Sequence, residues 1–65
     1  MKAAPEPGQL WEKFSSTKVS QRRITEVTSG EVEYVNIRKD GSEGAHRRAS
    51  LASFVVWTRD AQLAV

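Results

Sequence analysis

The sequence predicts an all-β protein, a small five-stranded SH3-like barrel with one 3₁₀ turn before its last strand. Residues 24–41 (ITEVTSGEVEYVNIRKDG) hold two segments rich in β-branched residues and two Gly-terminated turn signals, a pattern typical of β-hairpins. The 65 residues suffice for one small domain. The expected order of elements is strand, loop, long hairpin, strand, helical turn and short strand, which is the layout of an SH3-like barrel.

The first half of the chain predicts two strands that follow a short arm. Residues 9–14 (QLWEKF) form the first strand. Residues 15–20 are polar and rich in Ser and Thr, so we expect a loop there, and residues 21–27 form the second strand. The Thr-Ser-Gly sequence at residues 28–30 suits a three-residue hairpin loop with Gly30 in the left-handed conformation and a bulge beside it.

Residues 31–38 give the strongest strand prediction, although their apolar side chains do not keep one parity. Val32 and Tyr34 point to one face of an extended strand, whereas Val35 and Ile37 point to the other. A long strand that bends, and is shared between the two halves of a small barrel, accounts for this pattern.

The second half of the chain predicts two more strands around a short helical turn. An Asp-Gly pair at residues 40–41 marks a tight turn, and residues 45–50 form a fourth, basic strand. Residues 50–54 form a single 3₁₀ turn that Ser50 caps. Residues 55–57 (VVW) form the short closing strand.

Closure of the sheet into a barrel removes the unpaired edges that a tiny domain would otherwise expose. We therefore expect a flexible arm at residues 1–8 and the barrel at residues 9–58. Residues 59–65 form a C-terminal tail that frays or adds a short helix. An OB-like barrel is the alternative, but that fold usually needs more residues and a longer helix.

Composition restricts the cofactors and locations open to this chain. It has no Cys and one His, which excludes disulfides, Cys-based zinc sites and multi-histidine metal sites. We expect neither a metal nor an organic cofactor. No apolar run approaches the roughly 20 residues that span a bilayer, and the N-terminus lacks the apolar segment of a secretory signal. We therefore expect a cytoplasmic protein with no membrane partner.

The side chains available for catalysis are few. There is no Cys nucleophile, and His46 has no Ser or Asp at a recognisable spacing. Gly41 and Gly44 lack the strand-to-helix context of a phosphate-binding loop. Glu31 and Glu33 share one strand face, where a hairpin edge explains them better than acid–base chemistry. We expect no enzymatic activity.

The net charge is +2, and the whole basic surplus lies in residues 34–65. With a two-residue turn at the Asp-Gly pair, Arg47 lies opposite Tyr34, and Arg48 lies opposite Glu33. One interpretation is a phosphate-binding face beside Tyr34 that consists of Arg38, Lys39, His46, Arg47 and Arg48. The other is ordinary cross-strand packing, with Arg48 paired to Glu33 and Arg47 flat on the Tyr34 ring.

Two tryptophans, Trp11 and Trp57, fall in the expected first and last strands, which meet when a small barrel closes. We expect one of them in the core and the other half exposed. An exposed Trp is a typical anchor for a protein or base contact, and Trp57 therefore joins the candidate binding residues.

Three segments resemble small phage and prophage proteins with SH3-like or related barrel folds. They are PGQLW at residues 7–11, the hairpin from Arg23 to Val32, and LASF at residues 51–54. The matching residues are nearly all structural. The resemblance therefore implies a barrel fold and a mobile-element origin, and it transfers no binding site.

Two functional hypotheses follow. The first is a non-enzymatic interaction module from a phage or other mobile element, which binds a host or self protein through an exposed strand edge and one Trp. Mild net charge favours it. The second is a DNA- or RNA-binding barrel that uses Lys18, Arg22, Arg23, Arg38, Lys39, Arg47 and Arg48. The basic fourth strand favours it. A homo-oligomer with a purely structural role is a third possibility.

Overall fold

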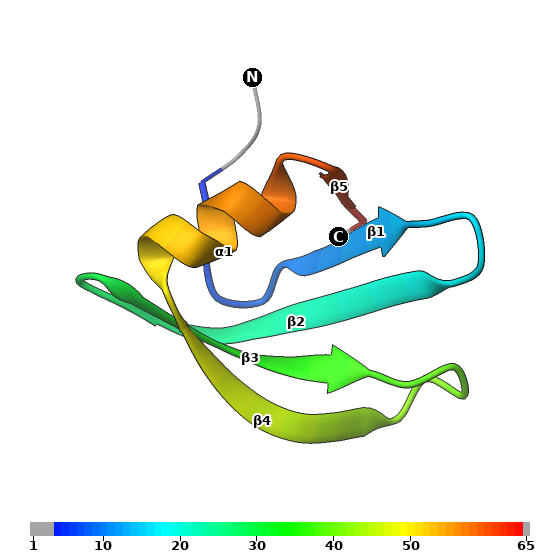
Figure 1. The fold of residues 1–65 in the computed structure, drawn as a ribbon. Coiled ribbons are helices and arrows are strands. Elements are labelled where there is room, and N and C mark those ends of the chain that lie inside the picture. The colour runs from blue at the N-terminus through cyan, green and yellow to red at the C-terminus, as the bar shows by residue number, and fades with distance from the viewer. Residues whose placement is uncertain (1–3, 65) are drawn as a thin grey trace.

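The computed structural model describes residues 4–64, which form one antiparallel sheet and one helix (Figure 1). The elements are β1 (Leu10–Phe14), β2 (Val19–Thr28), β3 (Glu31–Ile37), β4 (Glu43–Ser50), α1 (Leu51–Thr58) and β5 (Ala61–Leu63). The five strands lie in the order β4-β3-β2-β1-β5. A small, mostly β protein is confirmed. The sheet does not close, because β4 and β5 are its two outer strands, and a barrel is therefore not confirmed.

The helix corrects two details of the expected fold. The expected 3₁₀ turn is instead an α-helix of 8 residues, and residues 55–57, expected as the closing strand, are its last full turn. The β-branched residues at 55 and 56 suit a strand locally. A helix forms here because it places Phe54 and Thr58, four residues apart, on one buried face.

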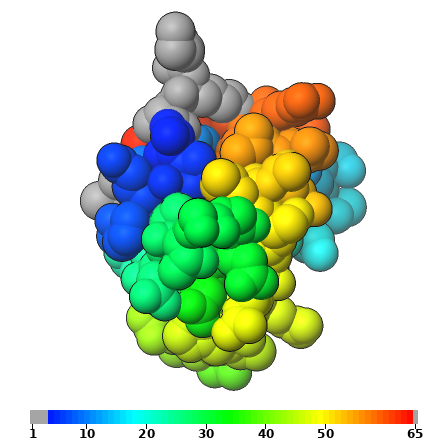
Figure 2. Space-filling view, turned by 90° about the vertical axis from the view of Figure 1, so that its left-hand side faces the viewer, coloured from blue at the N-terminus to red at the C-terminus, as the bar shows by residue number. Residues whose placement is uncertain are grey.

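The start of the helix agrees with the expected cap. The hydroxyl of Ser50 accepts a hydrogen bond from the backbone N–H of Ser53 at 3.1 Å, which satisfies one of the free donors of the first turn. The backbone N–H of Leu51 donates to the carbonyl of Gly30 at 2.9 Å. This bond fixes the start of α1 beside the β2–β3 hairpin, and Figure 2 shows the two in contact.

The closing strand lies further along the chain than expected. The sequence predicts a tail at residues 59–65, but the structure places β5 there. The first and last strands do meet, since Trp11 pairs with Leu63 and Lys13 pairs with Ala61. Trp57 does not take part in that pairing.

One face of the sheet, which we call the helix-side face, packs against α1. The core between them contains Trp11, Ile24, Val32, Tyr34, Phe54 and Ala61. The indole N–H of Trp11 donates to the side-chain carbonyl of Gln9 at 2.9 Å, so its polar atom is satisfied within the core. Trp11 is thus the core tryptophan, and Trp57 is half-buried at the core's margin.

The pairing of β3 with β4 follows the expected register because a longer loop and a β-bulge compensate each other. Tyr34 lies opposite Arg47, and Glu33 lies opposite Arg48, as expected. The loop is one residue longer than a two-residue turn, because the hairpin closes between Arg38 and Ser42. A β-bulge further along the pair adds one residue to β4 and restores the register.

The N-terminal segment leads into β1 and forms hydrogen bonds with the same neighbouring strand, β2. The backbone N–H of Gly8 donates to the carbonyl of Ile24, and the N–H of Ile24 donates to the carbonyl of Gln9, both at 2.9 Å. Residues 1–3 of the expected flexible arm lie outside the described residues. Within residues 4–64, no helix is long and apolar enough to cross a membrane.

Candidate anion-binding surface

Charged side chains divide unevenly between the two faces of the sheet. Directly paired residues share a face, so the strand register assigns each of them. Of the residues that the structure places in strands, all the acidic ones lie on the face away from the helix: Glu12, Glu26, Glu31, Glu33 and Glu43. The helix-side face carries the basic residues Lys13, Arg22 and Arg47. That face therefore has cations without strand carboxylates beside them.

Arg22 occupies the centre of this surface. Its guanidinium carbon lies 4.2 Å from the ring centroid of Trp57 and 4.6 Å from that of Tyr34. The ring of Phe54 lies behind them, at 6.0 Å. A guanidinium at these distances is attracted by the ring faces. The two rings come from α1 and β3, so three elements hold the side chain of Arg22 in place.

Burial lowers the pKa of Arg22 from its ordinary value, and the interaction with the Tyr34 hydroxyl opposes this effect. An arginine stays protonated at any physiological pH despite such a change. The direction reflects the partial burial of the guanidinium between α1 and the sheet. A carboxylate beside the guanidinium would raise the pKa instead.

The donors of Arg22 have no acceptor within the described chain. Among residues 4–64, neither a hydrogen bond nor an ion pair from its guanidinium is recorded, whereas Arg48 on the other face pairs with Glu33 at 3.8 Å. No buried side-chain nitrogen or oxygen lacks a hydrogen-bond partner there either, so the open donors of Arg22 face solvent. They are free to take two oxygens of an incoming anion.

Lys13 and Arg47 flank Arg22 on the same face. The ammonium of Lys13 lies 5.5 Å from the ring centroid of Trp57, on the β1 side. Arg47 is exposed and lies opposite Tyr34, on the β4 side. We call Lys13, Arg22 and Arg47 the cationic row. From strand spacing and rise, this row runs diagonally across four strands over about 20 Å.

The structure separates the residues that the sequence groups into one phosphate-binding face. Tyr34 and Trp57 adjoin Arg22, and Arg47 belongs to the cationic row. Arg48 and His46 lie on the opposite face by register, although they line a hollow of about 280 Å³ together with Arg47 and the acidic Glu33. His46 shares a hydrogen bond of 3.1 Å with the hydroxyl of Thr25.

The expected stacking on Tyr34 involves a different arginine. The guanidinium that lies over the Tyr34 ring belongs to Arg22, not to Arg47. The expected ion pair of Arg48 with Glu33 is present. Exposed pairs of this kind contribute little to stability.

Arg38 and Lys39 lie at the end of the sheet, beside a hollow of about 390 Å³ on the other face. Lys18 joins them there. Two of the three strand residues of this hollow lie next to acids, because Ile37 pairs with Glu43 and Gln21 pairs with Glu12. The mixed charges make this hollow a weaker anion site than the cationic row.

Sequence reasoning missed Lys13, and it gave Arg22 no more weight than its neighbour Arg23. Strand parity is the signal that separates them. Arg22 pairs with Trp11, and Arg23 pairs with Leu10, so the two arginines lie on opposite faces. Lys13 has the parity of Trp11 and therefore lies on the same face as Arg22.

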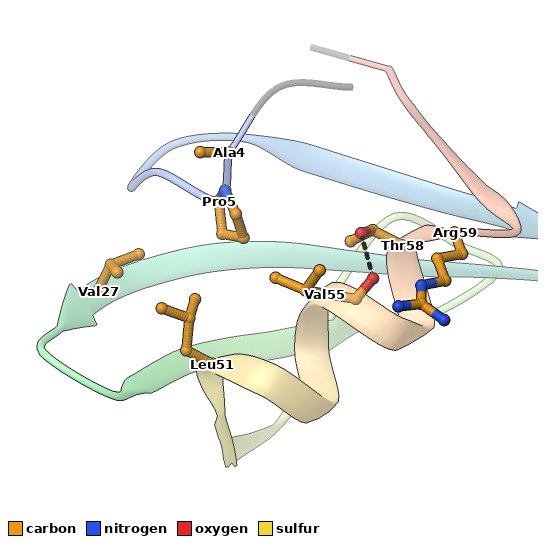
Figure 3. A pocket seen from close by; sticks show the side chains of 7 residues that line it. All are labelled: Ala4, Pro5, Val27, Leu51, Val55, Thr58 and Arg59. Carbon is orange, nitrogen blue, oxygen red and sulfur yellow. Dashed lines mark hydrogen bonds between the residues drawn. The ribbon is translucent and has the colours of Figure 1, made fainter. Parts of the chain in front are cut away.

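A second hollow, of about 470 Å³, opens between the helix and the N-terminal segment (Figure 3). It is lined by Ala4, Pro5, Val27, Leu51, Val55, Thr58 and Arg59. Figure 3 shows Val27, Leu51 and Val55 pointing into it, while the hydroxyl of Thr58 donates to the carbonyl of Val55 at 2.7 Å. Its walls are mostly apolar and provide no pair of groups for acid–base or nucleophilic chemistry.

Within the described residues, no three His, Cys, Asp or Glu side chains lie together as a metal site would need. Comparisons with protein-family models, with curated proteins and with solved structures find no match to this chain.

Proposed function

We propose that this protein is a non-enzymatic interaction module that binds a polyanionic partner along the cationic row. One observation carries the proposal: the guanidinium of Arg22 is positioned by the rings of Trp57 and Tyr34 and has no acidic partner within the described chain. Partial burial of a charge without an acidic partner carries a desolvation cost. An anion from outside the chain would offset that cost.

The arrangement favours binding in two ways. The aromatic contacts already restrict the Arg22 side chain, so less side-chain freedom is lost when an anion binds. The planar guanidinium matches two oxygens of a phosphate or carboxylate at once. Lys13 and Arg47 add charge on both sides, and within the described strands no carboxylate has the parity of this face.

The proposal is tested by NMR titration of the ¹⁵N-labelled protein with sodium tripolyphosphate at low salt. We expect the Arg22 Nε–H, the Trp57 indole N–H and the backbone amide of Arg47 to shift together. The matched internal controls are Arg23 and Arg48, the sequence neighbours that lie on the opposite face. Equal shifts at the controls, or none anywhere, would contradict the proposal.

A protein partner is the second candidate, and one observation favours it. The strand β4 pairs with β3 alone and spans 8 residues, so its outer edge is free to accept an added strand. Arg47 and Arg48 give this edge a positive charge, which suits an acidic extended segment. An acidic peptide of alternating Thr and Glu should then slow amide exchange along β4. Unchanged exchange on β4 would contradict this candidate.

Origin, location and fold relationship are parts of the same proposal. The segments that resemble small phage proteins support a mobile-element origin. The cysteine-free composition fits the reducing cytoplasm. The pairing of the first strand with the last, after a meander and a short helix, supports a relationship to SH3-like barrels. Self-association would show as stability that depends on protein concentration.

A further inference from the structure

We infer that the polyanion is a single-stranded nucleic acid whose phosphate backbone follows the cationic row. This inference rests on the proposed function and names the partner. It assigns to Arg22 the role of binding one phosphate through two oxygens, with Lys13 and Arg47 contacting phosphates on either side.

The polar groups between the cations favour a nucleic acid over an acidic polypeptide. Ser20 lies opposite Lys13 and Asn36 lies opposite Arg22, so both share the helix-side face. Neither side chain has a recorded hydrogen bond within the described residues. Hydroxyl and amide groups contact phosphate oxygens, sugars and base edges in nucleic-acid complexes. The Asn36 amide can donate to a phosphate oxygen and accept from a base N–H group at the same time.

The position of Arg22 favours a single strand over a duplex. Arg22 lies on β2, between two neighbouring strands, and its guanidinium contacts Trp57 from the helix that rises over the same face. An anion must therefore enter the angle between α1 and the sheet. A flexible strand can bend into this angle, whereas a duplex is stiff over this length. Basic grooves with aromatic side chains are typical of proteins that bind single strands.

The experiment measures fluorescence anisotropy of a labelled DNA strand of about twelve nucleotides, within the site sizes known for small single-strand binders. Its blunt duplex and poly-glutamate are the comparison probes. Three phosphate contacts on a single strand predict that affinity falls about 20-fold between roughly 50 and 200 mM salt. We expect the single strand to bind more tightly than the duplex and poly-glutamate.

Matched variants locate the site on one face. Arg22→Gln should weaken binding of the single strand and reduce the salt effect to about sevenfold, because one phosphate contact is lost. Arg23→Gln, one residue away on the opposite face, should keep the wild-type salt effect. Arg47→Ala and Arg48→Ala form a second such pair on β4, both exposed. Circular dichroism confirms that each variant is folded.

The possible outcomes separate the inference from the proposed function. If the duplex binds as tightly as the single strand, or if poly-glutamate binds and the strand does not, the inference is overturned while the proposed function stands. If Arg22→Gln and Arg23→Gln weaken binding equally, the assignment to the helix-side face is overturned. If neither these probes nor tripolyphosphate binds, the proposed function itself fails.

Discussion

The guanidinium carbon of Arg22 lies 4.2 Å from the ring centroid of Trp57, and this contact joins β2 to the last turn of α1. The same guanidinium lies 4.6 Å from the ring of Tyr34 on β3. The helix and two neighbouring strands thus meet around one positive charge. A charge in that position has to be desolvated in part, and this cost is consistent with the proposed role of Arg22 in binding.

The first prediction concerns the stability of Arg22→Met. Methionine is shorter than arginine and does not reach as far over the rings, but its thioether packs favourably against aromatic side chains, and the substitution removes the half-buried charge. We expect the free energy of unfolding to stay within about 0.5 kcal/mol of wild type or to rise. Urea denaturation measures this change, and the anion titration of the same variant should show binding lost. A loss of stability above about 2 kcal/mol would identify Arg22 as a structural residue.

The second prediction concerns the core under α1. Phe54 is fully buried, and Phe54→Ala should cost about 3–5 kcal/mol because a cavity is left behind. A domain of this size has only a few kcal/mol of stability, so we expect the variant to be largely unfolded by circular dichroism. Val56 lies on the same helix and is 54% exposed. Val56→Ala should leave the protein folded, and comparable damage from both changes would contradict the observed helix orientation.

The third prediction concerns the helix cap. Ser50→Ala removes the acceptor for the N–H of Ser53 and should lower the free energy of unfolding by about 1 kcal/mol. Ser16→Ala, at an exposed position in the β1–β2 loop, is the control and should change it by less than about 0.5 kcal/mol. Thermal melts of both variants test this. Equal melting temperatures would show that the cap contributes nothing.

The fourth prediction concerns pH. The hydrogen bond that protonated Glu26 donates to the carboxylate of Glu33, together with charge repulsion from Glu33, raises the pKa of Glu26, and attraction to Arg48 opposes this. A raised pKa in the folded state means that stability from this pair is fully present below the unfolded pKa and is lost as pH rises through the folded pKa. Glu26→Gln should therefore be more stable than wild type at neutral pH. The difference should shrink below the ordinary Glu pKa of about 4.3.

The pKa of Asp40 is shifted in the opposite direction to that of Glu26, so the expected pH dependence is also opposite. Hydrogen bonds from the side chain and backbone of Ser42 lower the pKa of Asp40. Its contribution is present above the unfolded pKa and is lost as pH falls through the folded pKa. Asp40→Asn should be less stable than wild type at neutral pH, with a smaller difference in acid. Urea midpoints across this pH range that move in parallel for both variants would contradict these assignments.

Local patterns predicted much of the sheet. The β2–β3 hairpin formed where β-branched segments meet Gly30, which has a positive φ of 97° as expected. The expected three-residue loop was wrong, because Thr28 pairs with Glu31 and leaves a two-residue loop. The positions of Arg47 and Arg48 opposite Tyr34 and Glu33 were also predictable, although through a shorter loop than the one present. Such features depend on residues close in the sequence, whose preferences act in the same direction as the fold.

Residues 55–57 show where local preference failed. Valine and tryptophan favour strands, so the local sequence predicts a strand at these residues. The helix forms because Phe54 fills the core from α1 and Ser50 caps its first turn. Burial of a large aromatic side chain outweighs a few tenths of a kcal/mol of propensity per residue.

The sequence by itself determined an antiparallel β protein, the hairpin around Gly30 and a basic surplus in the second half of the chain. Only the tertiary structure decided that Arg22, and not Arg23 or Arg47, would lie over aromatic rings. The parity of β2 sets the face of each arginine, but the packing of α1 decides which face receives Trp57. Contacts between residues far apart in the chain depend on that packing, and no local pattern encodes it.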